Sequence, residues 1–165
     1  MSLNLKEKQN HKYSVSLTWT GNKGLGTQRY DTYDRDFTLK ADKKPDLIGS
    51  SDPAFRGDPT RWNPEDLLVS SLSACHQLWY LHLCAVNQIN VIAYFDEAIG
   101  TMVEHGSGSG EFTLVTLQPT IEISKDSDVD LAKNLHQTAH ELCFIARSVN
   151  FEVACNPTII VSDNF

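Results

Sequence analysis

The stretch that most constrains the fold is an apolar segment over residues 61–85, RWNPEDLLVSSLSACHQLWYLHLCA. Asn63 is a favourable N-cap, Pro64 suits the first helical position, and acidic residues follow where the helix dipole is positive. The rest of the segment contains neither Gly nor Pro, and its apolar residues occupy more than one face. The pattern predicts a helix that ends near Asn87 and is buried on most of its circumference.

Strands are expected on both sides of this helix. Alternation of apolar and polar residues predicts half-buried strands, and clusters of Gly, Asn and Ser predict the turns between them. Residues 20–26 read as a hairpin turn, and residues 41–62 as a long loop. The strands are expected at residues 13–19, 27–33, 37–39, 91–100, 111–124 and 151–161, with Pro157 at an edge or at the limit of the last strand.

A second helix is expected between the last two strands, capped by Ser127 or Asp128 and running to Arg147. Each of the two helices carries a cysteine, Cys75 or Cys143. Strands before and after two separated helices predict an α+β fold in which an antiparallel sheet packs on two central helices. Residues 1–12 are expected to be disordered, and residues 13–165 to form a single domain.

Composition and charge exclude several classes of function. The 165 residues include 14 Lys or Arg and 21 Asp or Glu, a net charge of -7. An acidic protein is a poor partner for nucleic acid or for an anionic membrane surface. Neither a long apolar run nor a signal peptide is evident, which predicts a cytoplasmic protein. In a reducing compartment its four cysteines are core residues, metal ligands or reactive thiols.

The cysteines allow two interpretations. Cys75 and Cys143 lie 68 residues apart on predicted helices, and packed helices can bring facing cysteines within disulfide reach. The alternative is that both are small, inert core residues, as most buried cysteines are. Cys84 falls on the opposite face of the helix from Cys75 and is expected to serve packing. Cys155, in the last strand, is expected to lie in the core.

A metal site is the rival interpretation. The spacing of His136, His140 and Cys143 places all three on one helix face, and both residue types bind zinc. A fourth ligand could be Cys75 or His76. The chain lacks the paired-cysteine spacing of structural zinc sites, so we give this interpretation less weight.

Two motifs resemble those of a known family. NPEDLL at residues 63–68, followed by SACH at residues 73–76, resembles the helix start and first cysteine of the OsmC/Ohr peroxidases. HELCFIARS at residues 140–148 resembles the segment around their second cysteine, and the order of elements is similar over residues 13–161. The resemblance implies an OsmC-like fold and an intertwined homodimer with its sites at the interface.

The resemblance also implies an activity in oxidative-stress defence. Cys75 would attack an organic hydroperoxide as a thiolate, giving a sulfenic acid that Cys143 converts to a disulfide. A dithiol reductant would reopen that disulfide, so no cofactor is expected. This agrees with thiol chemistry, in which the thiolate is the nucleophile and a second thiol prevents over-oxidation. The alternative is a non-catalytic protein of the same fold that binds a small ligand in the apolar pocket at the interface.

In the family, an arginine held by a glutamate activates the first cysteine. Glu65 matches that glutamate, although an acidic residue also stabilises a helix N-terminus without any catalytic role. Arg56, in the loop before the helix, is the preferred arginine. The other candidate cations are Arg29, Arg61 and Lys23. Two departures from the common motifs, His76 after Cys75 and Phe144 after Cys143, indicate the OsmC-like branch of the family.

Overall fold

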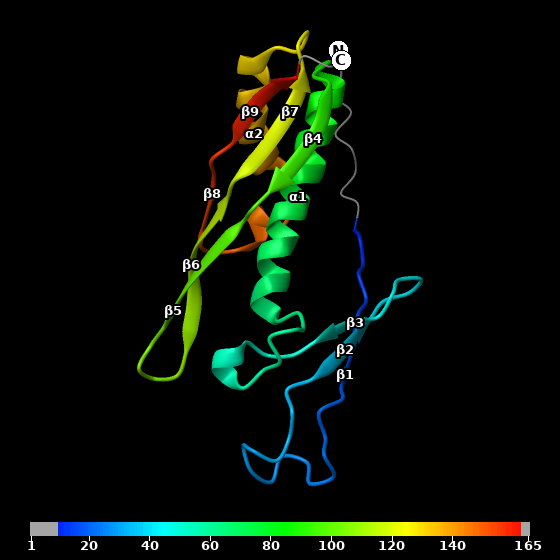
Figure 1. Cartoon of the computed structure of the whole chain (residues 1–165), viewed down its shortest axis with the longest axis vertical. Coiled ribbons are helices and arrows are strands. Elements are labelled where there is room, and N and C mark those ends of the chain that lie inside the picture. The colour runs from blue at the N-terminus through cyan, green and yellow to red at the C-terminus, as the bar shows by residue number, and fades with distance from the viewer. Residues whose placement is uncertain (1–9, 163–165) are drawn as a thin grey trace. The chain divides into compact units, whose positions relative to one another are not determined.

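The structure is a computed structural model that describes residues 10–162 and divides into two compact units, one up to Pro64 and the other from Glu65 onward (Figure 1). Residues 1–9, most of the segment predicted to be disordered, lie outside the described residues. In the part that the structure describes, no helix is long and apolar enough to cross a membrane.

The first unit contains a three-stranded antiparallel sheet, ordered β1 (Ser16–Trp19), β2 (Phe37–Lys40) and β3 (Leu47–Gly49). The predicted return strand at residues 27–33 is wrong, because β1 pairs with β2 instead. The Asn22 side chain accepts hydrogen bonds from the backbone N–H groups of Gly24 and Gly26, at 2.9 and 3.0 Å. These bonds wrap the predicted turn into a wide loop. The short 3-10 helix η1 (Pro53–Phe55) and β3 lie within the predicted long loop.

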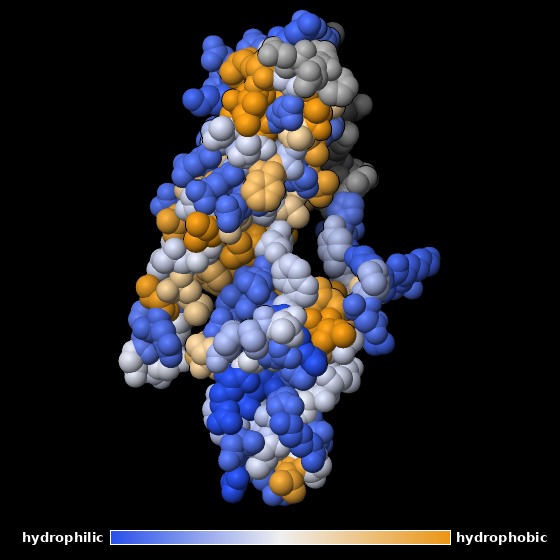
Figure 2. Space-filling model, viewed as in Figure 1, coloured by the Kyte–Doolittle hydropathy of each residue, from blue (hydrophilic) through white to orange (hydrophobic). Residues whose placement is uncertain are grey.

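Helix α1 (Pro64–Val86) dominates the second unit and begins and ends as predicted, within one residue. Its fully buried residues recur every fourth position and form one stripe, made by Leu72, His76, Tyr80 and Cys84. Most other positions of the helix are half-buried, so the prediction that it is buried on most of its circumference holds except along one exposed stripe, on which Leu78 is 67% exposed. Apolar side chains also appear among hydrophilic ones on the face shown in Figure 2.

Each of the last three predicted strands is broken into two. The pieces form two three-stranded sheets, ordered β4-β7-β9 and β5-β6-β8. The two pieces of each predicted strand therefore lie in different sheets. The pieces are β4 (Val91–Asp96) and β5 (Ile99–Glu104), β6 (Gly110–Leu117) and β7 (Pro119–Ser124), and β8 (Glu152–Cys155) and β9 (Thr158–Ser162).

The sheets are mixed, not purely antiparallel as predicted. β4 pairs with β7 and β5 with β6 antiparallel, but β8 and β9 run parallel to β6 and β7. The physical reason is the helix that connects β7 to β8. A helical crossover carries the chain back to the end of the sheet at which the earlier strand began, so the next strand runs parallel to it. Pro157 separates β8 from β9, as expected for a residue that cannot donate to a strand ladder.

That connecting helix, α2 (Val129–Leu142), is capped by Asp128, whose side chain accepts a hydrogen bond of 2.9 Å from Leu131 N–H. The helix ends at Leu142 and not at Arg147. Cys143 is its C-cap, with an extended backbone at ψ 110°, and a 3-10 turn, η2 (Ala146–Ser148), follows. The second cysteine is therefore at the end of a helix and not within one, a correction to the predicted fold.

The core of the second unit has two parts. One is the larger cluster between α1, α2 and the β4-β7-β9 sheet, and it contains Tyr80, Cys84, Ile89, Ile121, Ile123, Ala132, Leu135 and Ala139. The other lies against the β5-β6-β8 sheet around Leu72, Val115 and Leu117. Cys84 lies in the core, as its position opposite Cys75 predicts.

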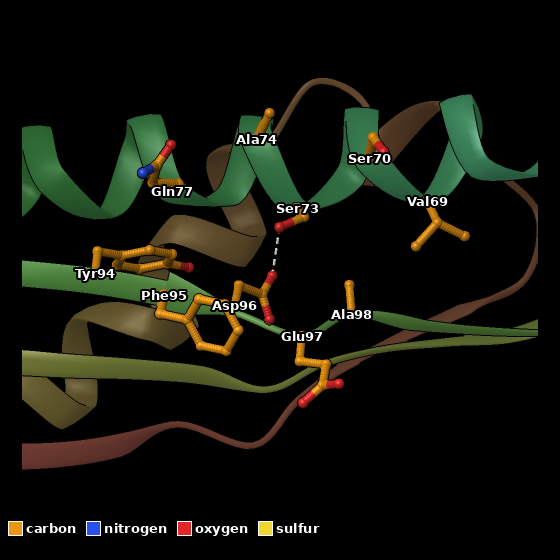
Figure 3. A pocket seen from close by; sticks show the side chains of 10 residues that line it. All are labelled: Val69, Ser70, Ser73, Ala74, Gln77, Tyr94, Phe95, Asp96, Glu97 and Ala98. Atoms are coloured by element: carbon orange, nitrogen blue, oxygen red, sulfur yellow. Dashed lines mark hydrogen bonds between the residues drawn. The ribbon is translucent and has the colours of Figure 1, made fainter. Parts of the chain in front are cut away.

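Asp96 ties the two sheets to α1 at the point where the strands break. One carboxylate oxygen accepts a 2.7 Å hydrogen bond from Gln118 N–H, in the break between β6 and β7. The other accepts a hydrogen bond from the Ser73 hydroxyl on α1, drawn as a dashed line in Figure 3. The Asp96 carboxylate thus links the end of β4, the junction between β6 and β7, and helix α1.

Replacement of Asp96 by Ala should lower the free energy of unfolding by about 2–3 kcal/mol, because hydrogen bonds to a charged group are the strong class. The measurement is chemical denaturation followed by circular dichroism. The matched control is Glu97→Ala, which removes the neighbouring exposed carboxylate and should change stability by no more than about 0.5 kcal/mol. Equal effects of the two substitutions would contradict the role assigned to Asp96.

Candidate functional site

The first candidate residue, Cys75, lies on α1 at the flank of the buried stripe and is half-buried. It precedes His76, and neighbouring residues on a helix point about 100° apart. His76 points into the core, with 1% of its surface exposed, so Cys75 points toward a different surrounding. One helix therefore supplies two adjacent residues to two separate environments.

The second candidate residue, Cys143, is fully buried at the end of α2. Its sulfur accepts a hydrogen bond of 3.3 Å from Ala146 N–H in the 3-10 turn that follows. Burial, together with an interaction with the neighbouring Cys75 side chain, raises the pKa of Cys143 to about 11. Cys143 is therefore a thiol at neutral pH.

The structure thus brings together two thiols that lie far apart in the sequence. Two thiols that interact directly are placed so that a disulfide can form between them. The two thiols are not equivalent, because Cys143 is buried and protonated, whereas Cys75 is more exposed. In the part of the chain that the structure describes, all four cysteines are reduced.

Glu65, in the first turn of α1, is half-buried. Its Oε2 atom is buried and accepts no hydrogen bond from any described residue. A buried carboxylate oxygen without a partner costs free energy, and a cation is the partner that best offsets that cost. The environment of Glu65 therefore favours a cation beside it.

The four candidate cations lie in the first unit and differ in their partners. Lys23 pairs with Asp34 at 2.6 Å, and Arg29 with Asp31 at 2.9 Å. Arg61 pairs with both Asp36 and Asp58, at 3.3 and 3.1 Å. Arg56 differs, because among the described residues no carboxylate pairs with it; its guanidinium lies 5.5 Å from the centre of the Tyr30 ring.

Arg56 also has an uncommon backbone conformation, since it closes η1 with φ at 66° in the left-handed region. Such a conformation costs a non-glycine residue about 1–3 kcal/mol, and strained residues cluster at functional sites. Arg56 is therefore both the least engaged and the most strained of the four candidate cations.

A hollow of about 480 Å³ lies between α1 and β4, and some of the residues that line it are close to Cys75 in the sequence (Figure 3). Ser73 and Gln77 line it from the helix, and Tyr94 and Asp96 from the strand. Ala74, which precedes Cys75 in the chain, is among its lining residues, but Cys75 is not. The hollow is therefore lined by residues on either side of Cys75 in the sequence but not by Cys75 itself.

The second cluster of reactive side chains is made by His76, His136 and Cys155. His76 Nε2 lies 2.9 Å from His136 Nδ1, and the Cys155 sulfur lies 3.5 Å from the first nitrogen and 3.8 Å from the second. Among the described residues this is the one group of three His, Cys, Asp or Glu side chains whose atoms could share a metal ion.

The metal ligands predicted from sequence are therefore corrected. His136 does meet His76, but His140 and Cys143 are not members of the group, and Cys143 contacts Cys75 instead. Cys155 was expected to be only a core residue. Its partners lie 79 and 19 residues away in sequence, so no local pattern could have indicated them.

Burial keeps both histidines of this cluster neutral. Desolvation lowers the pKa of His76 to about 4 and that of His136 to about 3. Burial also raises the pKa of Cys155 to about 12, with a further contribution from the Asp96 carboxylate. The His136 ring stacks on Tyr80 at 3.8 Å between ring centres, and its Nε2 is buried without a hydrogen-bond partner among the described residues.

Comparison with known proteins identifies similar chains. A family model described as OsmC-like protein matches residues 57–157. An OsmC-like protein of unknown function from Vibrio cholerae is 29% identical over 92% of this chain and 100% of that one, with a TM-score of 0.80. No curated protein matches the chain.

Two further structures share the fold at lower identity. An organic hydroperoxide resistance protein from Elizabethkingia anophelis is 17% identical over 93% of this chain and all of that one, with a TM-score of 0.64. The organic hydroperoxide resistance protein OhrB of Bacillus subtilis is 21% identical over 90% of this chain and 98% of that one, with a TM-score of 0.60.

The two buried histidines predict a loss of stability in acid. Their pKa values are lower in the folded than in the unfolded chain, so the unfolded chain binds more protons below about pH 6.5. The stability present above that pH is lost as the pH falls toward 4, at up to about 2.7 kcal/mol per pH unit for two histidines. Denaturation at a series of pH values, with a chelator present, measures this slope.

The control is His136→Phe, which keeps an aromatic ring against Tyr80 but removes one titrating group. Its slope in the same pH range should be smaller by about 1.4 kcal/mol per pH unit, the share of one proton. A slope equal to that of the unchanged protein would show that His136 does not titrate as its burial requires.

Proposed function

The chain belongs to the OsmC-like protein family, and on that premise we propose that it reduces organic hydroperoxides with the thiols of Cys75 and Cys143. The observation that carries the proposal is that the Cys75 and Cys143 side chains are close enough to interact, although they lie far apart in the sequence. Proteins of the same fold from Elizabethkingia anophelis and Bacillus subtilis are named organic hydroperoxide resistance proteins, which supports the choice of substrate.

In the first step the Cys75 thiolate attacks one oxygen of the hydroperoxide. The O–O bond breaks, the alcohol leaves after taking up a proton, and Cys75 becomes a sulfenic acid. The half-buried position of Cys75 suits this role, because the substrate must reach its sulfur. The alkyl part of an organic hydroperoxide gains about 25 cal/mol for each Å² that it buries against apolar residues.

In the second step Cys143 attacks the sulfenic sulfur. A disulfide forms, and the hydroxyl of the sulfenic acid leaves as water with the Cys143 proton. The raised pKa of Cys143 supports this order of events, because a buried thiol does not compete with Cys75 for peroxide. A dithiol then reduces the disulfide by thiol–disulfide exchange and is itself oxidised to a disulfide.

Glu65 and Arg56 complete the proposed site. A cation favours the thiolate form of Cys75, and the buried Oε2 atom of Glu65 needs a cationic partner. Arg56 is the candidate without a carboxylate partner among the described residues. We therefore assign Arg56 to this role, with Glu65 as the residue that positions it.

We also propose that the protein works as a homodimer. On α1, Leu78 is 67% exposed, although the helix sequence is apolar on more than one face. On β1, Leu17 is 62% exposed, although its alternating sequence is that of a half-buried strand. A second copy of the chain is the partner that could cover both of these exposed apolar surfaces, because oligomers of one chain bury apolar surface of this kind.

Replacement of Cys75 by Ser should abolish peroxide consumption in a coupled assay with a dithiol. Cys143→Ser should allow one turnover and then over-oxidation of Cys75, seen as added oxygen by mass spectrometry. In the unchanged protein, one equivalent of cumene hydroperoxide should remove two hydrogens and yield a peptide cross-linked between Cys75 and Cys143. The matched control is Cys84→Ala, which removes a buried thiol from the same helix. This variant should still reduce peroxide.

Full turnover by Cys75→Ser would refute the mechanism. No change at either cysteine after peroxide treatment would favour the alternative of a ligand-binding protein without turnover.

Replacement of Arg56 by Gly should lower the rate of Cys75 oxidation while stability stays equal or rises by about 1 kcal/mol, because glycine relieves the left-handed backbone. Glu65→Gln should also lower the rate with the fold intact. If the two residues act as a pair, the double variant should be no slower than the slower single one. The control is Arg29→Ala, which should keep the rate; a larger loss there than in Arg56→Gly would assign the role to Arg29.

A further inference from the structure

We propose that His76, His136 and Cys155 form a binding site for a divalent cation of the Zn²⁺ class, distinct from the Cys75–Cys143 thiol pair. The three residues come from α1, α2 and β8, so the fold itself brings them together. The proposal does not rest on the peroxidase function, because none of these residues takes part in that mechanism.

The spacing of the three ligand atoms supports the site. In a tetrahedral zinc site, with Zn–N near 2.05 Å and Zn–S near 2.3 Å, nitrogens lie about 3.3 Å apart and a nitrogen lies about 3.6 Å from a sulfur. Here the sulfur lies 3.5 and 3.8 Å from the two nitrogens, and the nitrogens lie 2.9 Å apart. A cation would need to separate the two imidazoles by only about 0.4 Å.

The protonation states of the ligands and the nearby Asp96 carboxylate also favour a cation. Imidazole binds metal only when neutral, and both rings are deeply buried, with His76 1% and His136 3% exposed. The Asp96 carboxylate acts electrostatically on both His76 and Cys155, and its negative charge attracts a cation to the same place. Binding would release the Cys155 proton to solvent and leave a thiolate ligand.

The site has a route to solvent. A hollow of about 420 Å³ is lined by His136 and Cys155, together with His140, Gln137 and Lys133. An ion can reach the ligand atoms from this side, and a water molecule or a small anion from the hollow can complete the fourth position. Three protein ligands with one open position are typical of zinc sites that exchange a ligand or carry chemistry, whereas purely structural sites are closed by four.

The choice of ion follows from the ligands. Two imidazoles and one thiolate suit zinc or copper, whereas the hard cations Mg²⁺ and Ca²⁺ prefer oxygen. Zn²⁺ accepts a tetrahedral site of mixed nitrogen and sulfur ligands without redox change. Co²⁺ takes similar geometry and absorbs light, so it serves as the probe.

The experiment is titration of the metal-free, fully reduced protein with Co²⁺, followed by competition with Zn²⁺. We expect one equivalent of Co²⁺ to give the thiolate-to-metal charge-transfer band and the intense visible bands of a four-coordinate site, and Zn²⁺ to abolish them. Cys155→Ser and His136→Gln should each weaken binding by at least about 100-fold, since even residues outside the ligand shell are worth about 10–100-fold.

Matched controls separate this site from the other thiols and histidines. Cys75→Ser, Cys143→Ser and His140→Gln should keep the cobalt spectrum and the affinity. In the unchanged protein, Zn²⁺ should slow alkylation of Cys155 by iodoacetamide and leave alkylation of Cys75 unchanged, a test that needs no substitution. Peroxide reduction by Cys75 is assayed separately, so failure of either proposal leaves the other standing.

The proposal is overturned if Co²⁺ gives no thiolate band at one equivalent, or if the band persists in Cys155→Ser. It is also overturned if the band is lost in Cys75→Ser or Cys143→Ser, because the metal would then lie on the other thiol pair. Circular dichroism of each variant shows whether it is folded, and the alkylation test decides the matter if Cys155→Ser and His136→Gln do not fold.

Discussion

The packing of α1 through a single buried stripe is the constraint on which the second unit depends. Leu72, His76, Tyr80 and Cys84 recur at intervals of four residues and meet both sheets and α2. Once that stripe is buried, the direction of every other residue on the helix follows from the helical turn. Cys75 and His76 are neighbours in sequence, yet they enter two different clusters, one of paired thiols and one of imidazoles with a third thiol.

The residue at which α2 ends determines which cluster Cys143 joins. His136 lies within the helix and faces α1 from the core, whereas Cys143 lies just beyond the last helical turn, where the backbone is extended. If the helix continued to Arg147, as its sequence pattern predicts, Cys143 would share one face with His136 and His140. Because it stops at Leu142, the backbone N–H of Ala146 is available to the Cys143 sulfur. Helix termination thus separates the thiol pair from the histidine cluster.

The thiols of Cys143, Cys155 and Cys84 differ in their surroundings, and this difference determines their chemistry. Cys143 is buried against another thiol, which makes it suited to form a disulfide. Cys155 lies against two neutral imidazoles, which makes it suited to a metal. Cys84 lies in the larger core cluster, where it serves packing. The same residue type in one chain therefore has three environments, each fixed by contacts between segments distant in sequence.

The sequence alone determined the elements whose signals are local. Pro64 and the acidic residues after it predicted the start of α1, Asp128 predicted the start of α2, and two short motifs indicated the OsmC-like family. Local signals suffice there because capping and periodicity act over a few residues. Only the tertiary structure decided that the long strands break near Asp96, that β8 and β9 run parallel, and that Cys155 meets His76 and His136. These features arise from contacts between residues 19 to 79 positions apart, which no local pattern encodes.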